Sequence, residues 1–176
     1  TSRLILGIRV YILSMSKSPP DLATISAGRI TMLPAFSGKN SNTSMNTPVS
    51  TPGGKQSDAR IMEDGHGGAF IAWKDARNGN NNPDIYVQRV DSLGYPKWVM
   101  DGLVLCNDTL DQSTPNITTD MNGGVIVCWS DKRSGGERDV YAQRVDFNGN
   151  ILWTTNGMPV ATKPNREHNE KIVSDD

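Results

Sequence analysis

The sequence predicts an all-β fold built from repeated four-stranded antiparallel sheets. Three observations support this prediction: a tandem repeat of about 55 residues, short β-type runs separated by glycine turns inside each repeat, and the lack of helical periodicity. A helix requires apolar residues at i, i+3, i+4 and i+7 across ten or more positions. No segment after the first fifteen residues provides that spacing.

The repeat is visible when residues 64–105 are aligned with residues 120–160, with sixteen identities over 42 positions and one gap. Trp73 corresponds to Trp129 at an offset of 56, and Trp98 corresponds to Trp153 at an offset of 55. The offset changes because one residue is lost in the intervening loop. Self-similarity at a fixed period is the signature of a repeat architecture.

Each copy is predicted to form four short strands in order along the chain. A short first strand leads to a glycine turn, a continuously apolar strand follows, and an alternating strand comes after a variable loop. A glycine-centred turn then leads to a fourth strand around the second tryptophan of each copy. The predicted strands are 60–62, 69–73, 85–90 and the region of Trp98 in the first copy, and 116–118, 125–129, 140–145 and 151–153 in the second.

The repeat also defines the predicted domain organisation. Residues 46–176 form the repeat region, with units at about 57–107 and 113–162 and a third unit that begins at about residue 168. Residues 1–45 form an N-terminal region that is irregular or a degenerate repeat.

Four strands per repeat are typical of a β-propeller blade. One four-stranded sheet buries only one face well, so each unit needs neighbours that cover its second face. Propellers close with about 4–8 blades, whereas this chain has two complete repeats and partial ones. We therefore expect a β-propeller-like fragment of a longer protein, with an open stack of sheets as the alternative.

The motif G-G-x-I-V-x-W-x-D-x-R followed by D-I/V-Y-x-Q-R-V-D-x-x-G-x-x-x-W resembles propeller-like repeats of large secreted bacterial surface proteins. The resemblance covers roughly residues 46–176 and implies an extracellular or cell-surface location. The Gly94–Trp98 and Gly149–Trp153 spacings also resemble the quinoprotein repeat, in which the tryptophan docks one blade onto the next. The similarity to the sialidase-type Asp-box is looser, and no catalytic residue is carried over from either family.

Composition argues against several function classes. The formal net charge is −1, so there is no basic footprint for nucleic acid. No stretch approaches the roughly 20 apolar residues of a membrane span. Two cysteines and two histidines are too few for a disulfide scaffold or a histidine-built metal centre.

Residues that recur in each copy are interpreted as structural, because a catalytic residue is needed once and a packing residue in every blade. The aspartate and arginine of each W-x-D-x-R motif lie two positions apart and are expected to form a charge-assisted pair. The predicted structural residues are Trp73, Asp75, Arg77, Trp98, Trp129, Asp131, Arg133 and Trp153.

Ligand contact is expected from the loops that differ between the copies, since rigid scaffolds place function on variable loops. The first loop is rich in oxygen ligands and could hold calcium, but it lacks the spacing of an EF-hand loop. We therefore expect no cofactor, with calcium as the open alternative. The candidate ligand residues are Asn78, Asn80, Asn81, Asn82, Ser134, Glu137 and Arg138.

These observations favour a non-catalytic binding or scaffold module whose partners are a protein or carbohydrate ligand and further blades of the same chain. The alternative is a fragment of a propeller-domain enzyme such as a sialidase-type glycoside hydrolase, which needs a carboxylate acid or base and usually an arginine cluster. The arginines in the strong motifs are duplicated, which weighs against the enzyme. Glu63 and Glu137 are non-repeated carboxylates without an evident partner in the sequence.

Overall fold

The computed structural model describes residues 8–11, 22–26, 29–33, 47–79, 82–162 and 172. Within these ranges all regular structure is β-strand, as the sequence predicts, and there is no helix. The described part of the chain accordingly has no helix long and apolar enough to cross a membrane.

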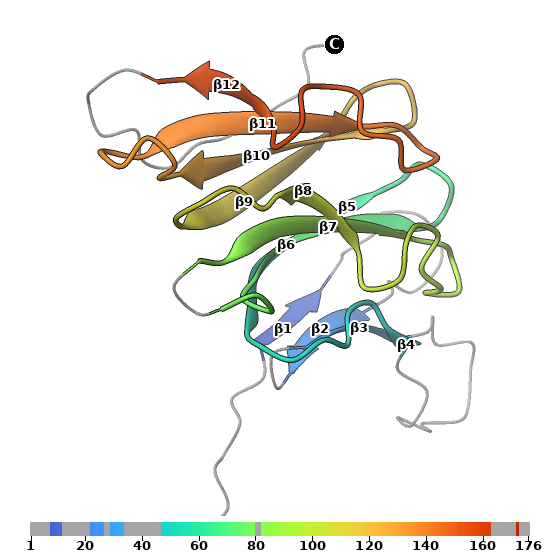
Figure 1. Ribbon diagram of the computed structural model, residues 1–176. Coiled ribbons are helices and arrows are strands. Elements are labelled where there is room, and N and C mark those ends of the chain that lie inside the picture. Colours follow the sequence, from blue (N-terminus) through green and yellow to red (C-terminus); the bar gives the residue numbers. More distant parts are fainter. Residues whose placement is uncertain are drawn as a thin grey trace, which may run out of the picture.

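The strands form three four-stranded antiparallel sheets, each a simple meander, and none of them closes on itself (Figure 1). The first sheet contains β1 (Ile8–Tyr11), β2 (Leu22–Ser26), β3 (Arg29–Leu33) and β4 (Thr47–Pro48). The second contains β5 (Gln56–Glu63), β6 (Ala69–Asp75), β7 (Asp84–Val90) and β8 (Leu103–Cys106). The third contains β9 (Gln112–Thr119), β10 (Val125–Asp131), β11 (Asp139–Val145) and β12 (Met158–Ala161).

The second and third sheets are two copies of one structure. In both, the two central strands pair without a shift, so that Trp73 lies opposite Tyr86 and Trp129 lies opposite Tyr141. The outer pairings contain register shifts at equivalent places in the two copies. The alignment of the sequence therefore corresponds to an alignment in space.

The fourth strand of each sheet differs from the sequence prediction. Trp98 lies before β8, and residues 151–153 lie before β12, in segments whose backbone pairing with the third strand is limited to isolated bridges. In each segment the backbone N–H of the tryptophan donates to the side-chain oxygen of a buried glutamine on the third strand, Gln88 in the first copy and Gln143 in the second. This bond replaces a backbone bond of a regular strand pair. A sequence pattern for a strand cannot reveal such a replacement.

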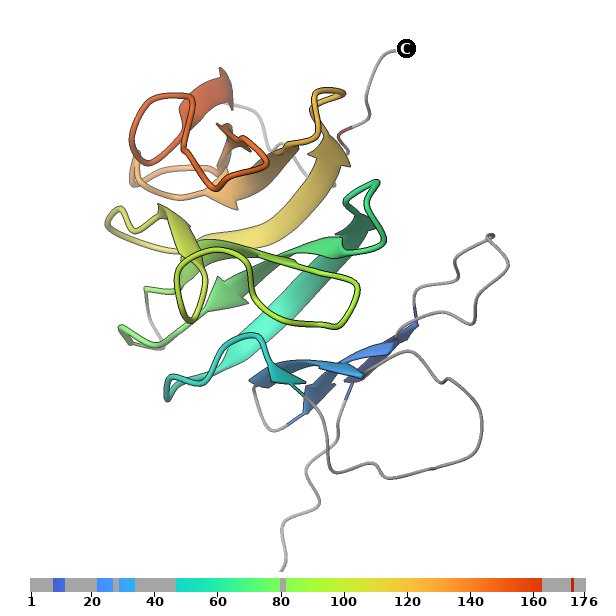
Figure 2. The same cartoon turned by 90° about the vertical axis from the view of Figure 1, so that its right-hand side faces the viewer.

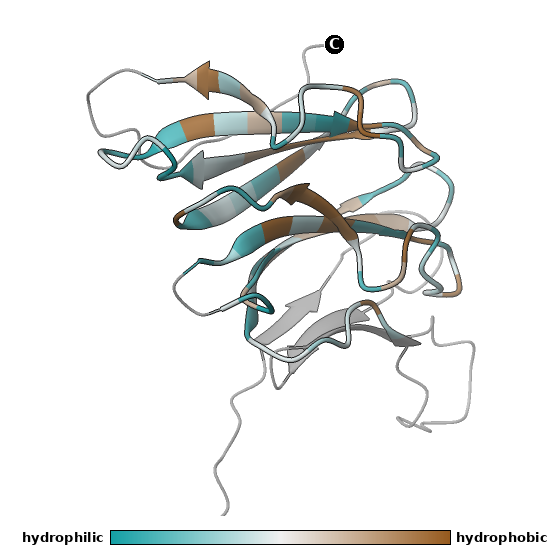
Figure 3. Cartoon of the chain, in the orientation of Figure 1, coloured by the Kyte–Doolittle hydropathy of each residue, from teal (hydrophilic) through white to brown (hydrophobic). Residues whose placement is uncertain are grey.

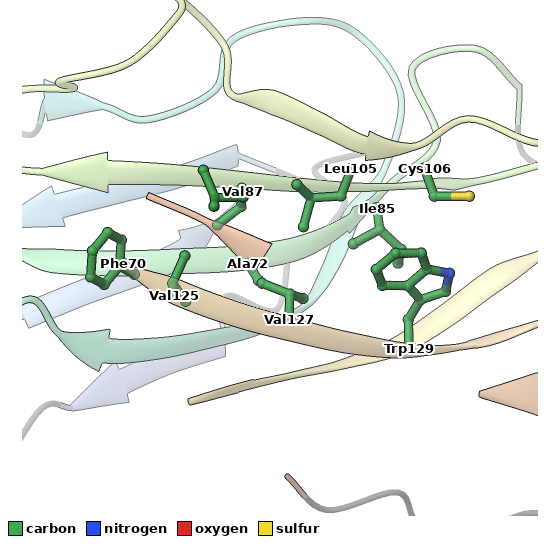
Figure 4. Packing of buried hydrophobic residues seen from close by; sticks show 10 residues of the cluster. Phe70, Ala72, Ile85, Val87, Leu105, Cys106, Val125, Val127 and Trp129 are labelled. Carbon is green, nitrogen blue, oxygen red and sulfur yellow. The ribbon is translucent and has the colours of Figure 1, made fainter. Parts of the chain in front are cut away.

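The second and third sheets pack face to face (Figures 1 and 2). Side chains of β6, β7 and β8 meet side chains of β10 and β11 in one cluster, in which Phe70, Val127 and Trp129 are at most 1% exposed (Figure 4). β8 is hydrophobic along its length, whereas hydrophilic and hydrophobic residues are mixed along β7 and β11 (Figure 3). This shared core holds the two copies in a fixed relation to each other.

Candidate functional site

The repeated motif builds a buried network around the carboxylate of Asp75 at the end of β6. The Trp73 indole donates from Nε1 to Asp75 Oδ2 at 2.8 Å, and Arg77 donates from Nη2 to the same oxygen at 2.6 Å. The Arg77 guanidinium lies over the Tyr86 ring, 3.8 Å from its centroid. Arg77 also donates to the carbonyl of Asp101 at 2.8 Å and thereby fixes the segment that leads into β8.

The second copy repeats this network around Asp131. Trp129 and Arg133 donate to Asp131 Oδ2 at 2.9 and 2.6 Å, and the Arg133 guanidinium lies 3.8 Å from the centroid of the Tyr141 ring. The carbonyl of Asn156 accepts from Arg133 at 2.8 Å. The predicted charge-assisted pairs thus form within each copy rather than between copies.

The arginine of each network links it to the preceding sheet. Arg77 donates to Ser50 Oγ at 3.1 Å, just after β4, and Arg133 donates to Cys106 Sγ at 3.0 Å, at the end of β8. Burial raises the pKa of the Cys106 thiol to about 12, so it is a neutral thiol at physiological pH. Cys106 and Cys128 are both buried, and neither forms a disulfide.

The hydrogen bonds stabilise the charged form of the two central carboxylates. Burial by itself would raise the pKa of Asp75 and of Asp131. Hydrogen bonds from the arginine and the tryptophan outweigh this desolvation and leave the pKa of each aspartate below its ordinary value. The indole N–H and one guanidinium nitrogen in each copy are committed to the carboxylate, so the network supports the fold, while Arg77 Nε and Arg133 Nε are buried without a hydrogen-bond partner.

A second repeated network lies at the opposite ends of the sheets. Asp64 and Asp120 each close the turn between the first two strands by accepting hydrogen bonds from backbone N–H groups. Each also binds an arginine of the third strand, Arg89 in the first copy and Arg144 in the second. Trp98 reaches across to the third sheet and donates from Nε1 to the carbonyl of Phe147 at 3.1 Å.

The candidate ligand residues lie on the β6–β7 and β10–β11 loops, which emerge at the same edge of the stacked sheets (Figure 1). We call this edge the variable rim and define it by residues 76–83 and 132–138 together with the linker 107–111. Asn78 donates to Asp84 at 2.8 Å, and Ser134 donates to Asp139 at 2.8 Å, so equivalent residues close both loops. Asn80 and Asn81 lie outside the described residues.

The variable rim also carries an ionic cluster that sequence reasoning missed. Lys74 of β6 lies 3.0 Å from Asp111, which directly precedes β9, and Arg138 of the β10–β11 loop binds the same carboxylate. Arg138 also donates to Ser113 Oγ at 2.6 Å. Lys74 aligns with Ser130, so the cluster is not repeated, and this loss of repetition was its only signal in the sequence.

The structure does not bring the non-repeated carboxylates together. Glu63 is the last residue of β5, before the turn at Asp64, whereas Glu137 lies in the β10–β11 loop of the variable rim. Within the described residues no group of three or more His, Cys, Asp or Glu side chains could hold a metal ion. Burial raises the pKa of Asp84, the carboxylate that closes the asparagine-rich loop.

Comparisons with protein-family models, with curated proteins and with solved structures found no match to this chain.

Proposed function

We propose that this chain is a non-catalytic β-propeller repeat module of a secreted or cell-surface protein, which binds a protein or carbohydrate ligand at its variable rim. One observation carries the proposal: the second and third sheets repeat the same strand order, register and buried Trp–Asp–Arg network, while the loops at one edge differ in length and chemistry. A framework that repeats and loops that vary are the features of a binding scaffold.

The stacking of the sheets supports the propeller-like half of the proposal. The second and third sheets are meanders of four strands that pack face to face through a shared apolar cluster, as propeller blades do. The contact between the sheets is asymmetric, because Trp98 of the second sheet donates to the carbonyl of Phe147 in the third. A contact between two different surfaces allows further units to be added in one direction.

The chemistry of the rim supports the binding half. The two loops present amide, hydroxyl and charged groups, and the Lys74–Asp111–Arg138 cluster locks one loop to the neighbouring sheet. A polar ligand that takes hydrogen bonds from several fixed groups suits this surface, because groups held in place lose little entropy on binding.

The test is a loop exchange in the full chain. Residues 78–83 are replaced by the sequence of residues 134–138, which makes the two loops alike and leaves both buried frameworks intact. The probes are an array of immobilised polysaccharides and an array of extracellular glycoproteins. We expect the unmodified chain to bind at least one probe, and the exchange to weaken that binding by about tenfold or more.

The matched control changes the opposite edge, with Asn148→Ala, an exposed residue in the β11–β12 connection. This control should leave binding unchanged. Binding that survives the loop exchange but is lost in the control would contradict the proposed site. Hydrolysis of a sialoside substrate by the unmodified chain would instead favour the glycoside hydrolase.

A further inference from the structure

The contact between the second and third sheets contains a specific docking device. The indole of Trp98 covers Gly149 so closely that a Cβ on this glycine would lie 2.8 Å from Trp98 Cδ1. The Arg89 guanidinium lies 3.5 Å from the centroid of the Phe147 ring. The third sheet therefore supplies an aromatic ring and a glycine, two residues apart, to a tryptophan and an arginine of the second.

On its other face, the third sheet carries the equivalent tryptophan and arginine. Trp153 occupies the place of Trp98, and its backbone is held by Gln143 as that of Trp98 is held by Gln88. Arg144 occupies the place of Arg89 and donates to Asp120 at 2.9 Å. Trp153 and Arg144 are thus held by the same hydrogen bonds as Trp98 and Arg89 of the second sheet.

This second device is less covered than the first. The side chain of Arg144 is 31% exposed, compared with 10% for Arg89. No aromatic ring lies over Arg144 among the residues that the structure describes, whereas Arg89 has Phe147. Ile126, which aligns with the buried Phe70, is also half-buried.

One residue of the chain already lies on this face. Ile172 packs against the cluster of Cys128, Val140 and Ala142. Its aligned residue Ile117 packs in the same way against the cluster shared by the second and third sheets. The face is therefore contacted at the position where the first strand of a following sheet would lie.

We propose that the face of the β9–β12 sheet that carries Arg144 and Trp153 is a docking surface for a further sheet, formed by the next copy of the repeat, whose first strand contains Ile172. The docking sheet places an aromatic ring against Arg144 and, two residues later, a glycine beneath Trp153. The inference rests on the sheet-stacking half of the proposed function and is independent of ligand binding at the variable rim. Ala161 takes the place of Cys106, so the docking sheet's arginine receives no thiol contact from β12.

The test extends the full chain in register. Asp175 and Asp176 align with Asp120 and Met121, so a copy of residues 122–162 is fused directly after Asp176. In this extended chain we expect Trp153→Ala to raise the equilibrium constant of unfolding by about tenfold or more. In the 176-residue chain the same substitution should raise it by less than about threefold, because less of the indole is covered.

Trp98→Ala is the matched control, since Trp98 is docked in both chains and its replacement should have the same effect in each. Equal effects of Trp153→Ala in the two chains would overturn the proposal, as would fused residues that gain no protection from hydrogen exchange. Concentration-dependent dimers of the 176-residue chain that Trp153→Ala abolishes would assign the face to a second copy and also overturn it. Rim binding is measured on the unextended chain, so its failure is distinguished from failure of this inference.

Discussion

At the scale of single residues, each repeat depends on one buried carboxylate that satisfies several donors. A buried indole N–H requires an acceptor, and Asp75 and Asp131 supply it while also pairing with an arginine and capping that arginine's backbone N–H. The arginine in turn covers a tyrosine ring, where its charge is attracted to the aromatic face. Removal of one member leaves the others unpaired in the core.

Asp131→Asn tests this dependence through pH. The pKa of Asp131 is lower in the folded state than its ordinary value of 3.8, so its stabilising contribution is complete above that value and is lost as the pH falls through the folded pKa. We expect the substitution to cost about 3 kcal/mol near neutral pH. Urea titrations from pH 7 to pH 2 should show a smaller loss of stability below about pH 4 than in the unmodified chain.

A fall of stability below pH 4 that is as steep in Asp131→Asn as in the unmodified chain would show that this carboxylate does not carry the effect. Ser174→Ala, which lies outside the described residues and belongs to no network described above, is the control substitution, and its stability should depend on pH as that of the unmodified chain does.

Gly157 tests the fit of the indole. A Cβ at this position would lie 2.5 Å from Trp129 Cη2, and the φ of +85° disfavours any side chain. Gly157→Ala should lower the free energy of unfolding by about 2–4 kcal/mol through overpacking and backbone strain. Gly136→Ala, where a Cβ would meet nothing within 4 Å, should change it by less than about 0.5 kcal/mol. Equal effects in thermal unfolding would contradict the role of Gly157.

At the scale of elements, the connection before each fourth strand is held by a buried glutamine. Gln143 accepts hydrogen bonds at Oε1 from the backbone N–H groups of Arg144 and Trp153, and donates from Nε2 to the carbonyl of Thr154 at 2.8 Å. Gln88 makes the same three bonds in the first copy. One side chain thus replaces several contacts of a strand.

Gln143→Ala should therefore loosen this connection. Three backbone groups lose their partner, so we expect a cost of about 2–4 kcal/mol and faster hydrogen exchange of the Trp153 amide. Thr155→Ala, at an exposed position of the same connection, should leave both quantities nearly unchanged. Unaltered exchange at Trp153 in Gln143→Ala would contradict the proposed role of the glutamine.

The elements also show how far the sequence can be interpreted. The apolar run that became β6 and the alternating run that became β7 were predictable as strands from their local patterns. The burial of every residue of β7 was not predictable, because an alternating run indicates a strand with one exposed face. The Asp75–Arg77 pair was predictable from its spacing. The fourth strand was misplaced because Gln88 holds the segment around Trp98, which is a tertiary effect.

The variable rim could be located from the sequence, because the two copies differ there, but its internal bonds could not. The contact of Lys74 with Asp111 joins residues from different sheets, and no local pattern encodes such a pair. Comparison of the two copies shows which residues they share and where they differ. It does not show which partners the differing residues contact.

At the scale of the whole molecule, Asp111 connects the sheets at the variable rim. We expect Lys74→Ala and Arg138→Ala each to cost about 0.5–1 kcal/mol, because both pairs are partly exposed. Raising the salt concentration to about 1 M should screen these pairs and reduce both costs. Chemical unfolding of the single and double variants at both salt concentrations gives the measurement, and costs that do not depend on salt would contradict an ionic contribution.

The shared apolar cluster makes a stronger prediction, that the second and third sheets unfold as one cooperative unit. Val127 of β10 is fully buried among side chains of both sheets, so Val127→Ala should lower the stability of both by about 2 kcal/mol. Native-state hydrogen exchange should show equal losses of protection in β7 and β11, although only β11 is covalently close to the substitution. Val160→Ala, at a position that is 62% exposed, should change neither strand. Loss of protection confined to β9–β12 would mean that each sheet is stable without its neighbour, which is contrary to the behaviour expected of stacked repeats.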